Sequence, residues 1–243
     1  MIEIAIHGAG RMAAAIVHTA HPREDLFITA TVGPEVPDWD SALAHFSSLQ
    51  SLPSLPAVLI DFSLPEGTGA AAEWCADNDV ALLSGVTGLP DKVKLALQDA
   101  AESVPVLWSP NLSLGISLLA VLAGQAAAVL GPDTPVAIED IHHQWKKDSP
   151  SGTALMLGDS IQSRRNDAAG QVEYSSIREG EVIGDHTITF NLAGEELVLA
   201  HRAHDRTIYA SGALSAAKWL ISQRAGLYSA ADWLDDRLDE STA

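Results

Sequence analysis

The chain opens with Ile2-Glu3-Ile4-Ala5-Ile6-His7-Gly8-Ala9-Gly10-Arg11-Met12-Ala13, the stretch that decides the fold of its first half. Alternating isoleucines predict a strand, and a helical pattern follows the G-x-G-x-x-A turn. In this context Gly8 permits the tight turn, Gly10 lets a pyrophosphate approach the backbone, and Ala13 allows close helix–strand packing. The start of the helix offers free N–H groups to an anion. We therefore expect a dinucleotide site, the alternative being a glycine turn that binds nothing.

The rest of the first half continues the alternation of strands and helices, which indicates βαβ units on a parallel sheet. Strands are expected at 2–7, 26–32, 57–61, 80–84 and 104–108, with helices at 12–20, 66–78 and 90–101. An acid at the end of the second strand usually binds the ribose 2′-hydroxyl of NAD. Here that strand ends in Thr31-Val32-Gly33, with no acid before Glu35. Arg11 can meet a 2′-phosphate or remain solvated, so the choice between NADH and NADPH stays open.

The second half has a different pattern. A long apolar helix is expected at 114–130, then a strand at 136–141, a helix opening near Ser151, three strands at 172–177, 186–192 and 196–203, and a last helix at 208–223. Thr187, Thr189 and Asn191 alternate with apolar residues, which indicates a sheet with one polar face. The fold class expected is α/β, with a Rossmann-like parallel-sheet dinucleotide domain and an α+β domain that has a mostly antiparallel or mixed sheet.

Composition excludes several classes of partner. The formal net charge is −18 and only five residues are lysines, so the surface repels nucleic acid and anionic membranes. No apolar run reaches the length of a membrane helix, and no signal-peptide pattern opens the sequence. Cys75 is the one cysteine, which suits a reducing cytoplasm. A chain this acidic must gather positive groups locally if it binds a small dianion.

Such a cluster occurs in His142-His143-Gln144-Trp145-Lys146-Lys147-Asp148-Ser149-Pro150-Ser151-Gly152-Thr153-Ala154. The segment from Pro150 to Thr153 is a helix start, whose N–H groups and hydroxyls can cradle a carboxylate. The neighbouring imidazole and ammonium groups can hold a second carboxylate and deliver protons. The alternative is that the histidines are ordinary surface residues and that Pro150 to Thr153 only cap a helix, with no binding role. A metal site is a poor competitor because no further cysteine or acid shows ligand spacing.

At these residues the chain resembles the 4-hydroxy-tetrahydrodipicolinate (dihydrodipicolinate) reductase family, and the likeness spans nearly its whole length. The stretches that carry it, besides 142–154, are Gly10-Arg11-Met12, Asp61 to Thr68, Gly85 to Gly88, Asn111 to Gly115, Arg178 to His186 and Arg206 to Gly212. The glycine turn is one residue shorter than is usual in the family, Val86 stands where threonine is usual, and Asp140 stands where glutamate is common.

The resemblance implies a role for each matching residue. His142 corresponds to the proton donor/acceptor and Lys146 to the proton-donating lysine. Contacts to the substrate carboxylate are implied for His143, Gly152 and Thr153, with Ser151 assisting through the helix start. Dinucleotide contacts are implied for Gly8, Ala9, Gly10, Arg11, Met12, Gly85, Val86, Thr87, Pro110, Asn111, Leu112 and Ser113, and no metal is implied.

The resemblance also implies the activity and its setting. The chain is expected to reduce 4-hydroxy-tetrahydrodipicolinate, a small dicarboxylate, with NADH or NADPH in diaminopimelate and lysine biosynthesis. Residues 1–111 and 207–243 are expected to form a discontinuous dinucleotide-binding domain, and 112–206 a substrate domain whose sheet builds a homotetramer. The alternatives are another NAD(P)-dependent reductase, acting on a small dicarboxylate imine, an amino-dicarboxylate or a sugar, and a non-catalytic dinucleotide sensor.

Overall fold

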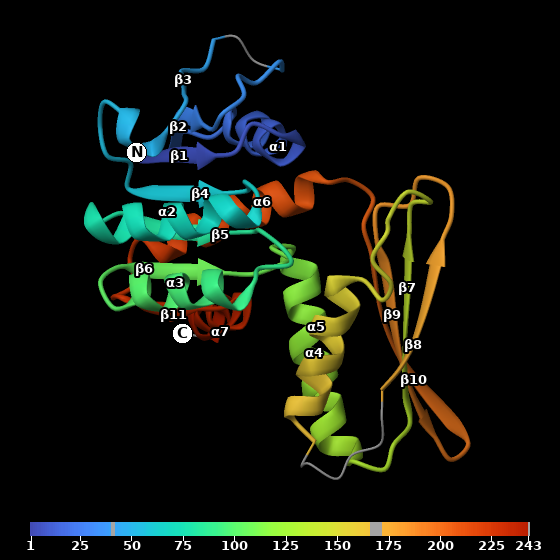
Figure 1. Cartoon of the computed structure of the whole chain (residues 1–243). Helices are drawn as coiled ribbons and strands as arrows, with labels where there is room; N and C mark the ends of the chain where they lie inside the picture. The colour runs from blue at the N-terminus through green and yellow to red at the C-terminus, as the bar shows by residue number, and fades with distance from the viewer. Residues whose placement is uncertain (40–41, 166–171, 243) are drawn as a thin grey trace. The chain divides into compact units, whose positions relative to one another are not determined.

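The computed structural model of the chain describes residues 1–39, 42–165 and 172–242. The chain divides into two compact units, each described by itself below (Figure 1). The first unit comprises Met1–Ser113 and Thr207–Ala243, so it is formed from two separate stretches of the chain. The second unit comprises Leu114–Arg206.

The first unit is built on a parallel sheet. Within the described residues its seven strands are β1 (Ile2–His7), β2 (Leu26–Val32), β3 (His45–Phe46), β4 (Val58–Asp61), β5 (Ala81–Ser84), β6 (Pro105–Trp108) and β11 (Gly226–Tyr228). They lie in the order β11-β6-β5-β4-β1-β2-β3. The order reverses at β1, as in Rossmann folds, and ligands of such sheets bind beyond the carboxyl ends of the strands near that reversal.

Helices cover both faces of this sheet. On one face, α1 (Arg11–Ala20) and α6 (Thr207–Leu220) pack on Ile4 and Ile6, together with Trp233 of α7 (Ala230–Thr242). On the other face, α2 (Pro65–Asp77) and α3 (Asp91–Ala101) pack on Ala5 and Leu59. A short 3-10 helix, η1 (Leu49–Ser51), lies beside α2. The strands are therefore buried on both faces, which explains their continuous apolar sequences.

The second unit is a mixed sheet with helices on one face. Its strands, in spatial order, are β10 (Glu195–Arg202), β9 (Asp185–Leu192), β7 (Val136–His142) and β8 (Val172–Arg178). Among the described strands of this sheet, β7 and β8 pair in parallel and the other two pairs are antiparallel. Ile138, Ile188 and Phe190 point to one face and pack against α4 (Leu114–Leu130) and α5 (Gly152–Ser163), which lie side by side (Figure 1). Thr187 and Thr189 point to the other face, as their alternation predicts.

The fold class expected from the sequence is confirmed, and every expected strand and helix is present with ends shifted by a few residues. Four elements were not expected: β3, η1, β11 and α7. The last helix expected from the sequence, 208–223, ends earlier in the structure, at Leu220. No helix among the described residues is long and apolar enough to cross a membrane.

Candidate active site

The glycine turn of the first unit has the form that a dinucleotide requires. Gly8 has a φ of +119°, and a Cβ there would lie 2.7 Å from the Phe62 carbonyl oxygen, so only glycine fits. A Cβ on Gly10 would meet nothing within 4 Å, which leaves the backbone open to a ligand. Gly10 caps α1 without a side-chain hydrogen bond, and the first turn of α1 holds no acid. The α1 start can therefore receive a pyrophosphate.

The neighbouring strand ends reach the same edge of the sheet. Gly85 follows β5, and its missing side chain leaves space that the Phe62 ring fills. The Trp108 indole donates to the Val86 carbonyl at 2.9 Å, which fixes the 85–87 segment. In the 110–113 segment, the Asn111 side chain accepts from the Ser113 N–H at 2.9 Å. All of the expected dinucleotide contacts thus lie in the first unit.

A buried carboxylate ties these strand ends together. Asp61, at the end of β4, is completely buried and accepts from His7 Nδ1 at 3.1 Å. Its other donors are the Ser63 N–H and hydroxyl, the Thr68 hydroxyl and the Ser84 hydroxyl. Burial alone would raise the pKa of Asp61, but the hydrogen bond and charge of His7 and the hydroxyl donors hold this pKa below its ordinary value. The loops for which dinucleotide contacts are expected are therefore held in place at these strand ends.

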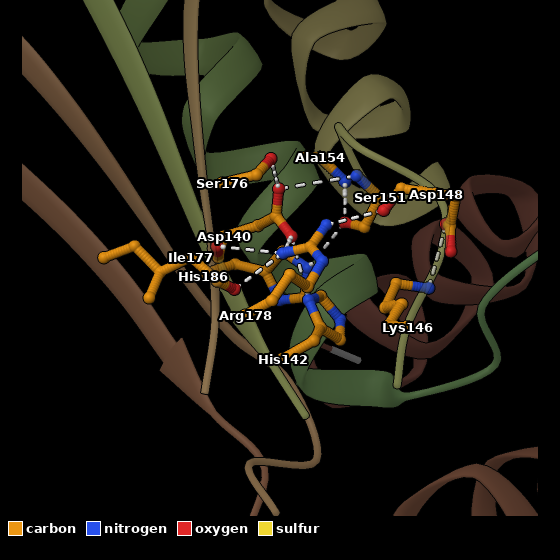
Figure 2. Close-up of polar contacts among 10 residues, drawn as sticks. All are labelled: Asp140, His142, Lys146, Asp148, Ser151, Ala154, Ser176, Ile177, Arg178 and His186. Carbon is orange, nitrogen blue, oxygen red and sulfur yellow. Dashed lines mark hydrogen bonds and ion pairs between the residues drawn. The ribbon is translucent and has the colours of Figure 1, made fainter. Parts of the chain in front are cut away.

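In the second unit, strand register gathers five polar side chains on the helix-covered face. Asp140 lies opposite Ser176 of β8 and opposite His186 of β9. His142, two residues further along β7, lies opposite Arg178. Because alternate residues of a strand share a face, all five side chains converge at one end of this sheet (Figure 2).

Asp140 is the centre of this cluster and is completely buried. Its Oδ1 accepts from His142 Nδ1 and from Arg178 NH1, both at 2.8 Å. Its Oδ2 accepts from the Ser176 hydroxyl at 2.5 Å and from the Ser151 N–H at 3.4 Å. Burial alone would raise the pKa of Asp140, but these donors outweigh burial and hold it below its ordinary value. The carboxylate therefore stays ionised.

His142 has a defined orientation and tautomer. An ionised carboxylate can only accept, so Nδ1 of His142 carries the proton and Nε2 is the nitrogen left to exchange protons. A Cβ on Gly184 would lie 3.1 Å from this Nε2, so the glycine leaves room beside it. Burial lowers the pKa of His142, and the nearby Lys146 ammonium lowers it further against the opposing effect of Asp140. The ring is thus neutral near pH 7.

His186 packs edge-on against the His142 ring, with 5.1 Å between ring centroids. Its Nε2 lies 3.3 Å from the Ser151 hydroxyl oxygen. Burial, and then the charge of His142, lowers the pKa of His186 to about 4. The His186 ring is therefore neutral near pH 7 and packs against His142 as an uncharged neighbour.

Lys146 lies on the loop between β7 and α5, where its Nζ pairs with Asp148 Oδ2 at 2.8 Å. Burial alone would raise the pKa of Asp148, but Lys146 and main-chain N–H groups, including that of Gly152, hold it below its ordinary value. The start of α5 therefore accommodates a carboxylate, here that of Asp148. Ser151 caps α5 by accepting from the Ala154 N–H at 3.1 Å and is itself buried.

The structure brings together His142, Lys146, Ser151 and the start of α5, all within the second unit. His143 packs on the Trp145 ring, and its buried Nδ1 has no hydrogen-bond partner among the described residues. Sequence reasoning assigned no role to Asp140, Ser176, Arg178 or His186. The position of Asp140 two residues before His142 in a strand was the available signal. In the described part of the chain, no group of three or more His, Cys, Asp or Glu side chains is arranged to hold a metal.

A Rossmann-type first unit with a dinucleotide turn, joined to a unit with a buried His–Asp pair, defines the class of two-domain nicotinamide-dependent oxidoreductases. Family models for the N-terminus and C-terminus of dihydrodipicolinate reductase match residues 2–112 and 115–234. The chain belongs to the dihydrodipicolinate reductase family.

Individual relatives agree with this assignment. The chain is 39% identical over 235 residues to the 4-hydroxy-tetrahydrodipicolinate reductase of Xanthomonas euvesicatoria, with 95% of this chain and 97% of the relative covered. It is 36% identical to that of Zymomonas mobilis, with 94% and 95% covered. The solved structure of a dipicolinate-bound dihydrodipicolinate reductase from Paenisporosarcina sp. TG-14 matches with a TM-score of 0.80 and 25% identity, covering 94% of this chain and 97% of that one.

Proposed function

We propose that the chain reduces 4-hydroxy-tetrahydrodipicolinate to tetrahydrodipicolinate with NADH or NADPH, in the biosynthesis of diaminopimelate and lysine. Family membership over both halves of the chain supports the reaction. The observation that carries the proposal is the buried Asp140–His142 pair beside the Lys146 ammonium. In an acidic chain, they place an ammonium group beside a neutral imidazole, so that a dicarboxylate can meet a counter-charge and a proton donor together.

The chemistry needs a hydride, a proton and the loss of the hydroxyl as water. The bound reduced nicotinamide supplies the hydride. The chain must then stabilise negative charge on the ring nitrogen and neighbouring carbon and protonate that carbon. His142 Nε2 and Lys146 Nζ are the candidates for proton delivery, the first oriented by Asp140 and the second by Asp148.

The substrate carboxylates are assigned to the groups around the start of α5. His143 directly follows β7 in the segment that leads to α5, and the main chain of Gly152 already contacts the Asp148 carboxylate. Thr153 lies in the same first turn of α5. Ser151 is buried in its capping role, so we assign it to holding the helix start, not to direct contact.

The dinucleotide is assigned to the first unit, at residues 8–12, 85–87 and 110–113. The open backbone at Gly10 and the uncapped start of α1 support this assignment. The first unit is thus the dinucleotide-binding domain, and the second unit is the substrate domain. The choice between NADH and NADPH stays open because Val32 and Gly33, at the end of β2, are buried and uncharged.

We further infer a homotetramer in the cytoplasm. The face of the second unit's sheet opposite α4 and α5 exposes Ile177 and Val198 among threonines, and such a mixed surface suits association between copies. The buried, unpaired Cys75 suits a reducing compartment.

The decisive experiment follows oxidation of NADH and NADPH in the presence of enzymatically generated 4-hydroxy-tetrahydrodipicolinate. We expect oxidation that depends on this substrate with at least one of the two cofactors. Turnover only with another dicarboxylate imine would favour a different reductase. Cofactor binding without turnover of any substrate would favour a dinucleotide sensor.

A further inference from the structure

The guanidinium of Arg178 contacts both residues that hold the two candidates for proton delivery. Its NH1 donates at 2.8 Å to Asp140 Oδ1, the same oxygen that accepts from His142 Nδ1. Its NH2 donates at 2.7 Å to the main-chain oxygen of Asp148, whose carboxylate pairs with Lys146. Figure 2 shows the guanidinium at the centre of these contacts. Arg178 therefore contacts both Asp140, which orients His142, and Asp148, which pairs with Lys146.

The chemistry of arginine suits this bridge. A guanidinium is planar and presents donors on separate nitrogens at fixed spacing, whereas the single ammonium of lysine cannot reproduce that fork. The Arg178 side chain is only 16% exposed, and its ion pair is therefore little screened by water. Because Arg178 pairs with His142 in the parallel β7–β8 ladder, its side chain leaves the strand on the helix-covered face.

We propose that Arg178 is a positioning residue, which sets His142 and Lys146 at a fixed separation for proton delivery to the substrate. This inference rests on the proposed reductase function. Without Arg178, Asp140 keeps its donors from Ser176 and Ser151, so His142 retains a partner. The Asp148 main chain loses this tether, and Lys146 moves relative to His142.

The test measures steady-state turnover of wild type, Arg178→Ala and Arg178→Lys with enzymatically generated substrate, alongside the dissociation constants of NADPH and dipicolinate. We expect kcat to fall about 100-fold in R178A with little change in either dissociation constant, since misplacement by about 1 Å has this effect. Added guanidinium at a non-denaturing concentration should restore part of kcat in R178A. R178K should remain impaired, because one nitrogen cannot hold both Asp140 and Asp148.

Arg23→Ala is the matched control, since Arg23 makes a comparable double hydrogen bond to Asp25 in the first unit, and it should keep wild-type kcat. A folded R178A with kcat within about threefold of wild type would overturn the inference. A wild-type kcat in R178K would also overturn the inference, and this measurement is sufficient if R178A does not fold. If wild type shows no turnover, the proposed function fails and this inference fails with it. If wild type turns over but R178A does so equally well, only this inference fails.

Discussion

Lys146 is the side chain whose removal most directly tests the proton-delivery assignment. Its ammonium is held by Asp148 and lies close enough to His142 to lower the pKa of that ring. We expect Lys146→Ala to lower kcat by a factor of about 100 to 10,000 while dinucleotide binding stays nearly intact. Steady-state kinetics and a cofactor titration measure the two effects.

The adjacent Lys147 provides the matched control because it is exposed and carries the same charge. Lys147→Ala should keep kcat near wild type. Equal turnover in the Lys146 and Lys147 variants would remove Lys146 from the mechanism.

Because the His186 ring is buried and neutral, we expect the stability of the protein to fall as the pH is lowered. Its ring titrates near 6.5 when unfolded, but burial lowers the folded pKa to about 4. As pH falls from 6.5 to 4, the unfolded state therefore binds a proton before the folded state does, and stability is lost. This ring alone should contribute a loss on the order of 3 kcal/mol across that window.

Urea denaturation at the two ends of this window measures the effect. His186→Gln should show a shallower loss of unfolding free energy than wild type. His18→Gln, at an exposed ring on α1, is the matched control and should keep the wild-type slope. An unchanged slope in His186→Gln would show that this ring does not remain neutral in the folded protein.

The composition of the site was only partly predictable. His142 and Lys146 stand four residues apart in a segment whose charge is unusual for this chain, so the sequence alone points to them. Asp140 could have been found from the two-residue period of a strand. Arg178 and His186 come from β8 and β9, and their proximity depends on strand register, which no local pattern contains.

The turn between β1 and α1 contains two glycines for which we expect different roles, one in stability and one in cofactor binding. Gly8→Ala places a Cβ against the Phe62 carbonyl at a positive φ, and should cost about 2 kcal/mol or more of stability. Gly10→Ala meets no neighbour within 4 Å, so thermal stability should stay at the wild-type value. Its methyl group would face the pyrophosphate, and we expect NADH and NADPH to bind at least about tenfold more weakly.

Thermal melts and fluorescence titration of the cofactor separate these outcomes. If Gly10→Ala instead bound both cofactors as tightly as wild type, the pyrophosphate would not lie on this turn.

Periodic elements were predictable and short or acidic ones were not. β11 is three residues long and pairs with β6 more than a hundred residues earlier in the chain. In α7, the buried residues Ala230, Trp233 and Leu234 have helical spacing, but they span only about one turn and much of the remaining sequence is acidic. Such elements are stabilised by long-range packing, so pattern analysis does not detect them.

The net charge of −18 bears on the proposed association between copies as well as on ligand binding. Copies of so acidic a chain repel one another, and salt screens this repulsion over about 10 Å at 0.1 M ionic strength. An interface between copies must therefore place apolar and uncharged side chains at the contact. The outer face of the second unit's sheet has such residues in Thr187, Thr189, Val198 and Ala200.

Val198 lies on that face and is 51% exposed, so it is the residue with which to test the proposed tetramer. Val198→Lys puts a charge in the proposed contact, and we expect sedimentation velocity to show dissociation to smaller species with unchanged secondary structure. Val129→Lys is the matched control, because Val129 is 84% exposed on α4, which covers the opposite face of the sheet. A tetramer that persists in Val198→Lys, or dissociates equally in Val129→Lys, would place the contact elsewhere. A monomeric wild type would show that the exposed valine and isoleucine on this face serve no association between copies.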